Sequence, residues 1–202
     1  MKPLDIETMP MIGLDIPEPE APKNYKDPEK IDKYKELARE KQAKTAALDP
    51  LYGMVCAVCV GDECRVLGDV GVETERDLLW WAHGAIYRAK SICTWNGTAF
   101  DVPYIYKRSI INALFPKLPM SDFLRPHNNI HVDLSRCWDF RGYTSLDAVA
   151  KAVLGEQKHE IDHASFPDLV KTDHGRDTVR SYCLQDARLT GHLCERFSGV
   201  LF

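Results

Sequence analysis

The sequence predicts an α/β domain built on a mixed sheet, and three observations support this class. Strand candidates 54–60 and 63–67 are joined by Gly61-Asp62, which indicates an antiparallel hairpin. Helix and strand candidates then alternate along the chain, as they do where a sheet has parallel strands. With 202 residues, 45% of them hydrophobic and 28% charged, the chain is long enough to bury one full core.

The N-terminal part begins with a strand and continues into a polar helix. Apolar and acidic residues alternate over 1–7, which is the period of a strand. A Pro-rich loop follows, and Asp27-Pro28 then predicts the N-cap and first residue of a helix that ends near Ala47. Residues 23–44 carry 8 basic and 5 acidic side chains, so this segment is positively charged.

The later elements are bounded by capping residues and glycines. Thr74 and Asp77 have the spacing of a capped helix start, and Gly155 is typical of a helix end. Trp80 and Trp81 are adjacent on the helix that Thr74 begins, so only one of them can face the core. The predicted helices are about 75–90, 101–114, 146–154 and 176–197; the predicted short strands are 91–95 and 130–134; and 156–175 is expected to be a His-rich loop.

Composition narrows the class of protein. The 30 acidic and 26 basic residues give a net charge of −4, which by itself argues against a nucleic-acid-binding protein. The seven cysteines are odd in number and scattered along the chain. No apolar run resembles a signal peptide or a transmembrane helix. We therefore expect free thiols and a cytoplasmic location.

One carboxylate lies on the core-facing side of the last helix. At 100° per residue, Asp186 falls in the middle of an apolar sector of roughly 120°. A buried carboxylate is costly unless a metal ion or a buried arginine compensates its charge, and a structural salt bridge remains an alternative at this point. The other members of the sector are Val179, Tyr182, Cys183, Leu189, Thr190, Leu193 and Phe197.

Further acids stand where a strand and a helix begin. Asp5 and Glu7 share one face of the first strand, and a divalent cation such as Mg²⁺ or Mn²⁺ would remove their mutual repulsion. In mid-chain, a short strand runs into Asn96-Gly97, and Asp101 follows where a helix begins. The alternatives are an Asn turn residue and an Asp N-cap, and each of these motifs alone is weak.

Together the motifs resemble a known family. The phrases LDIETMP, WNGTAFDVPYI and YCLQDARLT contain, in order, Asp5-x-Glu7, Asn96-x-x-x-Phe100-Asp101 and Tyr182-x-x-x-Asp186. They resemble the three motifs of DnaQ-like (DEDDy) 3′–5′ exonucleases. The chain is similar over nearly its whole length to the proofreading exonuclease domain of family B DNA polymerases and to stand-alone phage-type exonucleases.

The resemblance implies a ribonuclease H-like fold, a five-stranded mixed sheet flanked by helices. It implies a single exonuclease domain over 1–202 with a helical insertion at 14–50. It also implies two divalent metal ions, Mg²⁺ or Mn²⁺, whose four positive charges would bring the loaded protein near neutrality. The implied ligands are Asp5, Glu7, Asp101 and Asp186, and Tyr182 is implied to orient the attacking water.

The resemblance implies that the substrate is the 3′ end of single-stranded DNA and that hydrolysis releases 5′-mononucleotides. The implied location is the cytoplasm of a bacterium or of a phage-infected host. Thr8, Asn96 and Phe100 would place the terminal nucleotides, although Phe100 could equally belong to the core. A replication polymerase or a single-strand-binding protein is an expected partner. The alternatives are an exonuclease that degrades RNA or short oligonucleotides, and a non-catalytic polymerase-associated subunit.

Other patterns compete with these assignments. The pair Tyr143 and Asp147 has the same spacing as Tyr182 and Asp186, but Asp147 fits the first turn of a short helix. His163 and Asp168 have the spacing of a histidine subclass, but Pro167 would interrupt the helix that this subclass needs. The remaining candidates are a zinc site at Cys56, Cys59 and Cys64, which lacks a fourth ligand; His127 and His131 beside a strand; His159 and His174 in a loop; and Asp133, to which we assign no metal-ligand role.

Two features depart from the family. Pro3 leaves little strand before Asp5, so we expect the first strand to be weakly anchored. The lysines of residues 23–44 make the insertion a candidate arm that guides the substrate strand, and the alternative is a solvated helix that covers a sheet edge.

Overall fold

A five-stranded mixed sheet lies at the centre of the computed structural model, which describes residues 1–11, 13, 17–125 and 129–202. Its strand order is β3-β2-β1-β4-β5. The first three strands pair antiparallel, whereas β1–β4 and β4–β5 are parallel. The predicted α/β class is confirmed. The strands are β1 (Lys2–Pro10), β2 (Gly53–Val60), β3 (Glu63–Val66), β4 (Ile92–Thr94) and β5 (His131–Asp133).

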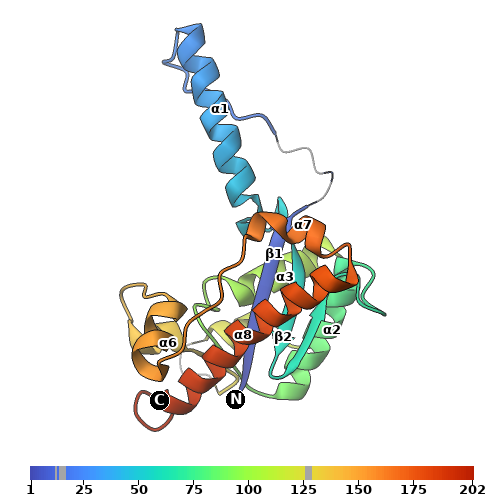
Figure 1. The fold of residues 1–202 in the computed structure, drawn as a ribbon, viewed down its shortest axis with the longest axis vertical. Helices are drawn as coiled ribbons and strands as arrows, with labels where there is room; N and C mark the ends of the chain where they lie inside the picture. Colours follow the sequence, from blue (N-terminus) through green and yellow to red (C-terminus); the bar gives the residue numbers. More distant parts are fainter. Residues whose placement is uncertain (12, 14–16, 126–128) are drawn as a thin grey trace.

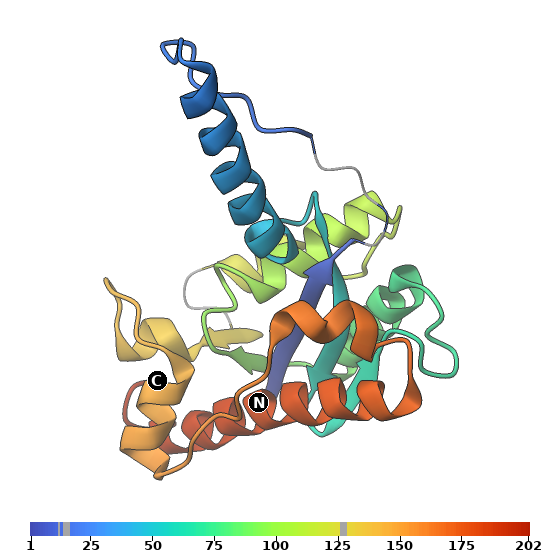
Figure 2. The same ribbon diagram turned by 45° about the horizontal axis from the view of Figure 1, so that its top comes forward.

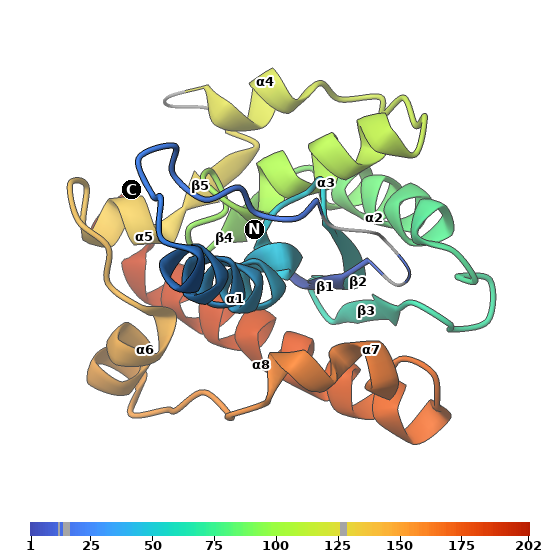
Figure 3. The ribbon, with the colours of Figure 1, turned by 90° about the horizontal axis from the view of Figure 1, so that it is seen from above.

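Helices cover both faces of the sheet. Figure 3 shows α2 and α3 on one side and α6, α7 and α8 on the other. One set of buried apolar side chains joins β1 and β2 to α2 and α3, and two others join the opposite face to α5, α6, α7 and α8. The helices are α1 (Pro28–Thr45), α2 (Glu75–Ala89), α3 (Asp101–Ile111), α4 (Met120–Leu124), α5 (Leu134–Trp138), α6 (Leu146–Leu154), α7 (Phe166–Leu169) and α8 (Asp173–Phe197), with 3₁₀ turns η1 (Ala46–Leu48) and η2 (His163–Ser165).

The strand β1 is longer and better anchored than the sequence predicted. It continues past Glu7 to Pro10 and is paired on both sides, so it is a central strand. At its start, Lys2 and Pro3 pair with β4, and the Pro3 carbonyl accepts a hydrogen bond from Gly61 N at 2.7 Å. A proline is tolerated near the first residue of a strand. The expectation of a weakly anchored strand is therefore wrong.

Most predicted capping residues are confirmed. Thr74 and Asp77 form a reciprocal capping box at the start of α2. The Asp27 carboxylate accepts a hydrogen bond from Glu29 N at 3.1 Å at the start of α1. Gly155 ends α6 with a φ of 73°, a left-handed conformation that glycine adopts without strain. These local signals therefore located the helix ends to within a few residues.

The shortest helices, α4, α5 and α7, were not predicted, because too few residues carry a periodic signal. The segment predicted as a loop contains η2 and α7, and Pro167 lies in the first turn of α7, where no N–H is needed. The helix α8 begins at Asp173, one turn earlier than predicted, because the Thr172 hydroxyl accepts from Gly175 N at 3.1 Å. In the described part of the chain, no helix is both long and apolar enough to cross a membrane.

The hairpin β2–β3 carries a disulfide that the sequence did not predict. Cys59 and Cys64 are opposite each other in the register, with Cα atoms 4.1 Å apart, and their Sγ atoms are bonded. The turn at Gly61, whose φ is 65°, sets this register. The expectation of free thiols is therefore wrong for this pair, and the proposed partners of a zinc site are bonded to each other. The other five cysteines are free.

A buried ion pair ties α2 to α3. The Glu75 carboxylate accepts from Arg108 Nε at 2.8 Å and from Arg108 Nη2 at 2.5 Å, and it also accepts from Val55 N and from Asn112 Nδ2, both at 2.8 Å. Both charged side chains are almost fully buried. A buried pair is costly to break because the remaining charge has no partner.

We therefore expect Arg108→Met to lower the free energy of unfolding by about 3–5 kcal/mol, because Glu75 would be left buried without its cation. Urea denaturation measures this change. The matched control is Arg88→Met, which removes an exposed arginine 3.7 Å from Glu63, and its expected cost is below about 1 kcal/mol. Equal losses in the two variants would contradict the buried-pair interpretation.

Candidate active site

Four carboxylates from three elements converge beside β1. Asp5 and Glu7 come from β1, Asp101 opens α3, and Asp186 lies in the middle of α8. Glu7, Asp101 and Asp186 are each no more than 6% exposed. Burial, followed by the charges of Glu7, Asp186 and Asp101, raises the pKa of Asp5 well above its usual value. The fold thus brings the four predicted acids together.

The helix α8 supplies two of the predicted site residues from its buried side. Every member of the predicted apolar sector is buried, and Asp186 lies among them. Tyr182 precedes Asp186 by one turn, so the two side chains are neighbours on one helix face. The sector also packs on the sheet through Cys183, whose Sγ lies 3.5 Å from Asp5 Oδ2. Packing therefore brings Tyr182 and Asp186 to β1.

A β-bulge lies where β1 reaches the site. The register with β2 shifts between Glu7 and Thr8. Such an irregularity bends a strand and redirects its side chains. Glu7 and Thr8 are both buried, whereas Asp5 is partly exposed. The bulge lies beyond Glu7, so it leaves the predicted shared face of Asp5 and Glu7 intact. After burial, the charge of Glu7 is the largest cause that raises the pKa of Asp5.

Asp101 is held in place by a loop that Asp133 organises. The Asp133 carboxylate accepts hydrogen bonds from Asn96 N and Thr98 N, both at 2.9 Å, and from Ser135 N at 3.2 Å. Asn96 has a φ of 64°, a left-handed conformation that asparagine adopts more readily than most residues. Asp101 is the first helical residue of α3 and not its N-cap. Asp133 therefore anchors the loop that leads into the site.

Burial makes this group of acids costly in the absence of a cation. Burial raises the pKa of Asp101 to about 7, and it also raises the pKa of Glu7 and of Asp186. Neighbouring carboxylates raise these values further, because each disfavours a second negative charge close by. The charge of Lys158 acts in the opposite direction on Asp186. An additional cation would relieve the remaining repulsion.

The donor atoms fit a hard divalent cation. Among the described residues, Asp186 Oδ1 is buried without a hydrogen-bond partner. Ligand atoms of Asp5, Glu7 and Cys183 all lie within 4.8 Å of one another. Carboxylate oxygens are the donors preferred by Mg²⁺ and Mn²⁺. Such an ion would bind the buried Asp186 oxygen that has no hydrogen-bond partner and would neutralise the nearby carboxylates.

Lys158 belongs to the site, and sequence reasoning missed it. Its Nζ is paired with Asp186 Oδ2 and lies 4.8 Å from the centre of the Tyr182 ring. Its backbone N donates to Asp147 Oδ1 at 2.8 Å, which fixes the loop after α6. Burial lowers the pKa of Lys158, but Asp186 and Tyr182 outweigh burial and raise it, so the amine is charged. A single lysine in a loop has no periodicity that could have predicted this position.

Tyr182 lies between Lys158 and a histidine. Burial raises the pKa of Tyr182 to about 12, so its hydroxyl keeps its proton at neutral pH. The His163 ring lies edge-on to Tyr182 with 5.5 Å between centroids, and His163 Nε2 is 3.8 Å from Glu7 Oε2. Asp168, the partner in the competing histidine pattern, is exposed and pairs with Lys171 instead. This geometry favours Tyr182 and Asp186 over that alternative.

The structure places the predicted substrate-binding residues around the same loop and strand. Thr8 is buried directly after Glu7 in β1. Asn96 and Phe100 flank the loop before Asp101 and are half-buried. The Phe100 ring lies 5.3 Å from Tyr104 and packs against the core, which is the alternative that the sequence left open for it.

The competing residues have structural roles. Asp147 lies in the first turn of α6, as predicted. His131 is not a loop residue but a buried residue of β5, where it shares hydrogen bonds with Thr94 Oγ1 at 2.8 Å and Phe123 O at 2.9 Å. His127 lies outside the described residues. The backbone N of His159 donates to a glutamine of α8. His174 is exposed, but it lies in the first turn of α8 and not in a loop as predicted. Trp80 is 70% exposed, whereas Trp81 packs on the core, as predicted.

Comparison with known families decides the assignment. The family model described as RNase_H superfamily matches residues 54–198. The chain belongs to the RNase H superfamily. The matched RNase H region contains Asp101, Tyr182 and Asp186, and the resemblance stated from the sequence motifs is confirmed at this level.

The RNase H chain is similar to part of several archaeal DNA polymerases. It is 33% identical over 141 residues to DNA polymerase 1 of Sulfurisphaera ohwakuensis. This match covers 60% of this chain and 15% of that protein. It is 31% identical over 124 residues to a DNA polymerase of Pyrococcus glycovorans. This match covers 52% of this chain and 16% of that protein. The chain therefore spans only about a sixth of the length of these relatives.

A solved structure shows the same fold. The family B DNA polymerase from the hyperthermophilic archaeon Pyrobaculum calidifontis superposes with a TM-score of 0.58 at 21% identity. The match covers 74% of this chain and 22% of that chain. The RNase H-like architecture inferred from the sequence is thus confirmed.

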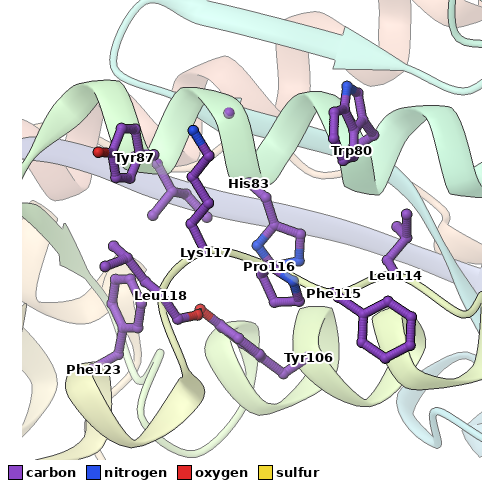
Figure 4. Close-up of a pocket in the computed structure, with 12 residues that line it drawn as sticks. Trp80, His83, Tyr87, Tyr106, Leu114, Phe115, Pro116, Lys117, Leu118 and Phe123 are labelled. Carbon is purple, nitrogen blue, oxygen red and sulfur yellow. The ribbon is translucent and has the colours of Figure 1, made fainter.

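A second concave region lies away from the acids. A pocket of about 300 Å³ opens between α2, α3 and the segment 114–118 (Figure 4). Its walls are aromatic and aliphatic side chains, and Lys117 Nζ lies 5.0 Å from the Tyr87 ring. Ser109 Oγ donates to Ile105 O and so accepts from His83 Nε2, both at 2.8 Å. His83 therefore donates from Nε2 and lines a largely apolar pocket.

His83 makes the RNase H domain sensitive to acid. Burial lowers the pKa of His83 to about 4, below its unfolded value near 6.5. The neutral ring therefore stabilises the fold above pH 6.5, and this stability is lost as the pH falls from about 6.5 to about 4. We expect a loss on the order of 1–3 kcal/mol that His83→Gln abolishes. Urea titrations at several pH values measure it, with the exposed His174→Gln as the control; identical pH profiles would contradict the assignment.

Proposed function

We propose that this chain is a metal-dependent 3′–5′ exonuclease that hydrolyses single-stranded DNA and releases 5′-mononucleotides. The observation that carries this proposal is the convergence of four carboxylates with one buried, unpartnered oxygen on Asp186. The similarity to parts of DNA polymerases supports a DNA substrate. We further propose that residues 1–202 act as one exonuclease domain in the cytoplasm, with 14–50 as an insertion.

We assign the metal ligands to the four acids. Two divalent ions, Mg²⁺ or Mn²⁺, would supply a nucleophilic water at neutral pH and stabilise the leaving 3′ oxygen. The acids provide hard oxygen donors, and burial, followed by the charges of nearby carboxylates, raises their pKa values, which supports a compensating cation at this site. The proposed ligands are Asp5, Glu7, Asp101 and Asp186.

Two observations support a role for Tyr182 and Lys158 in orienting a water molecule. Tyr182 keeps its hydroxyl proton at neutral pH, so the hydroxyl can both donate to and accept from a water molecule. The ammonium of Lys158 lies against the same ring and beside Asp186, where it holds the tyrosine and limits the net negative charge. We assign Tyr182 to orienting the attacking water and Lys158 to positioning Tyr182.

Residues that adjoin the proposed ligands in the chain are candidates to hold a strand end. Thr8 follows Glu7 in β1, and Asn96 precedes the helix that Asp101 opens. We propose that Thr8, Asn96 and the edge of Phe100 contact the terminal nucleotides. In the cell, we propose that 3′ ends are presented by a replication polymerase or by a single-strand-binding protein.

The test is a cleavage ladder from a 5′-labelled single-stranded oligonucleotide in Mg²⁺, Mn²⁺ or EDTA. Stepwise shortening from the 3′ end that EDTA abolishes would support the proposal. Cleavage of a circular single strand would indicate an endonuclease, and shortening of the matched RNA alone would change the substrate. Absence of cleavage under all conditions would indicate a non-catalytic binding subunit.

We expect Tyr182→Phe to lower kcat by roughly 10²-fold while leaving the metal affinity unchanged, because the hydroxyl acts on water and not on the ions. The measurement is the rate of oligonucleotide shortening as a function of Mn²⁺ concentration. Tyr143→Phe, which removes the hydroxyl of an exposed tyrosine, is the control. An equal loss of metal affinity would instead make Tyr182 a structural residue.

A further inference from the structure

A helical arm stands beside the carboxylate site and has no role in the proposed chemistry. The arm comprises the segment 17–27, α1 and η1. Figures 1 and 2 show α1 projecting from the body near the end of β1. The helix α1 has 18 residues, which corresponds to a length of about 27 Å. Because the helix points away from the sheet in both views, it does not lie along a sheet edge.

The arm joins the body of the protein at two places, and both places lie on elements that carry proposed metal ligands. The chain leaves β1 at Pro10, directly beyond the bulge at Glu7. Where the chain returns, Tyr104 Oη donates to Ala47 O at 2.8 Å, and Tyr104 lies one turn after Asp101 on α3. The arm is therefore fixed at its base next to the site.

One side of α1 is covered by the segment that leads into it. Arg39 Nη2 pairs with Glu18 Oε1 at 2.6 Å, and Gln42 Nε2 donates to Pro17 O at 3.5 Å. In Figure 3 this segment lies on the side of α1 nearer α3, which leaves the side toward α8 open. The half-buried residues of the covered side are Ile31, Lys35, Ala38 and Gln42.

Most exposed charges of α1 are sorted by sign, and Arg39, which pairs with Glu18, lies beyond the acids. At 100° per residue, Lys30, Lys33 and Lys41 fall within a sector of roughly 80°. The four acids of the helix occupy an adjacent sector of the same width. Tyr34 flanks the lysines on their other side, and its ring meets Tyr25 edge-on with 5.8 Å between centroids. The acids are Glu29, Asp32, Glu36 and Glu40.

Exposed lysines beside exposed aromatic rings match the chemistry of a single-stranded nucleic acid. The lysines attract phosphates, and a tyrosine ring can stack on any base. Tyr25 and Tyr34 remain 40% and 36% exposed although they contact each other. The net charge of the whole chain is −4, so this positive face is a local departure from the average.

We propose that the arm face formed by Lys30, Lys33, Tyr34 and Lys41 binds single-stranded nucleic acid on the 5′ side of the nucleotide held in the carboxylate site. This inference rests on the proposed function, because it concerns the same substrate. The acidic sector beside this face repels phosphates and so confines the strand to one side of the helix. The arm therefore favours long strands over short ones.

The test measures binding in EDTA, where no hydrolysis is expected, by the fluorescence anisotropy of labelled oligothymidylates of about 4 and about 30 nucleotides. The variant is Lys30→Gln/Lys33→Gln/Lys41→Gln, since glutamine preserves helix propensity. For the long strand we expect roughly tenfold weaker binding and a salt dependence whose log–log slope is smaller by about 2. For the short strand we expect no change.

The matched control is Asp32→Asn/Glu36→Gln/Glu40→Gln, which alters three charges on the adjacent sector of the same helix. We expect this variant to bind the long strand at least as tightly as the native chain. Circular dichroism shows whether each variant keeps its helix content. Tyr34→Ala separately tests stacking and should weaken binding of the long strand only.

Unchanged affinity and salt dependence in the lysine variant would overturn the proposal. A native chain that self-associates, together with a lysine variant that is monomeric and still binds nucleic acid, would also overturn the proposal and would show that the face binds a second copy. Failure of the proposed function is separable, because the cleavage ladder would then be blank while the anisotropy still reports binding. Normal cleavage with unchanged anisotropy would overturn the arm alone.

Discussion

Replacing Asp5 by Asn is expected to abolish hydrolysis and, in EDTA, to make the protein more stable. The two effects have one cause. Burial and the charges of Glu7, Asp186 and Asp101 raise the pKa of Asp5, so its ionised form is disfavoured in the folded state without metal. Asn removes that charge with little change of shape, and it also removes an oxygen ligand from the proposed metal site.

The expected loss of activity is at least about 10³-fold, because metal ions contribute several kcal/mol of charge stabilisation in such reactions. The expected gain in the free energy of unfolding in EDTA is about 1 kcal/mol or more. Thermal unfolding with and without Mn²⁺ measures both effects, since a bound ion stabilises only the folded state. The native chain should be stabilised by Mn²⁺, and the variant should be stabilised much less.

The control is Asp168→Asn, which makes the same chemical change on an exposed carboxylate. Its activity and its response to Mn²⁺ should equal those of the native chain. If Asp5→Asn lowered stability in EDTA, the acids would not repel one another as their raised pKa values indicate. If the variant kept the full Mn²⁺ response, Asp5 would not be a ligand.

Periodicity singled out the acids that lie on long elements, and the resemblance to a family then implied their roles. Asp186 stood out because it interrupts an apolar sector of α8, and the structure buries it with every other member of that sector. Asp5 and Glu7 stood out because strand periodicity places them together, and both lie on the central strand. These inferences need only local geometry, so a sequence suffices for them.

The parts that the sequence did not reveal depend on contacts between distant segments. Lys158 meets Asp186 through the packing of a loop that has no periodicity of its own. Asp133 anchors a loop 35 to 37 positions away in the chain. The disulfide of Cys59 and Cys64 follows from the register of a hairpin that was predicted, but its oxidised state does not follow from spacing.

Replacing Lys158 by Met is expected to lower kcat by roughly 10²-fold without weakening metal binding. Lys158 Nζ is paired with Asp186 Oδ2 and lies 4.8 Å from the Tyr182 ring centre. Met preserves most of the apolar stem, so the variant removes mainly the charge. Tyr182 would then lose the group that positions it, while Asp186 would lose a cation that competes with the metal.

The same variant should have the opposite effect on stability to Asp5→Asn. In EDTA, loss of the ammonium leaves Asp186 buried with less compensation, and the free energy of unfolding should fall. Added Mn²⁺ should restore it, because the ion supplies the missing positive charge. Lys171→Met, which removes an exposed lysine paired with Asp168, should change neither quantity.

A combined measurement separates a positioning role from a structural one. If Lys158 only stabilised the fold, saturating Mn²⁺ would restore both stability and kcat, and Lys158→Arg would behave like the native chain in both. If Lys158 positions Tyr182, saturating Mn²⁺ restores stability but not kcat. The rate loss should also be non-additive with that of Tyr182→Phe, because residues that act through one another share a single free-energy contribution.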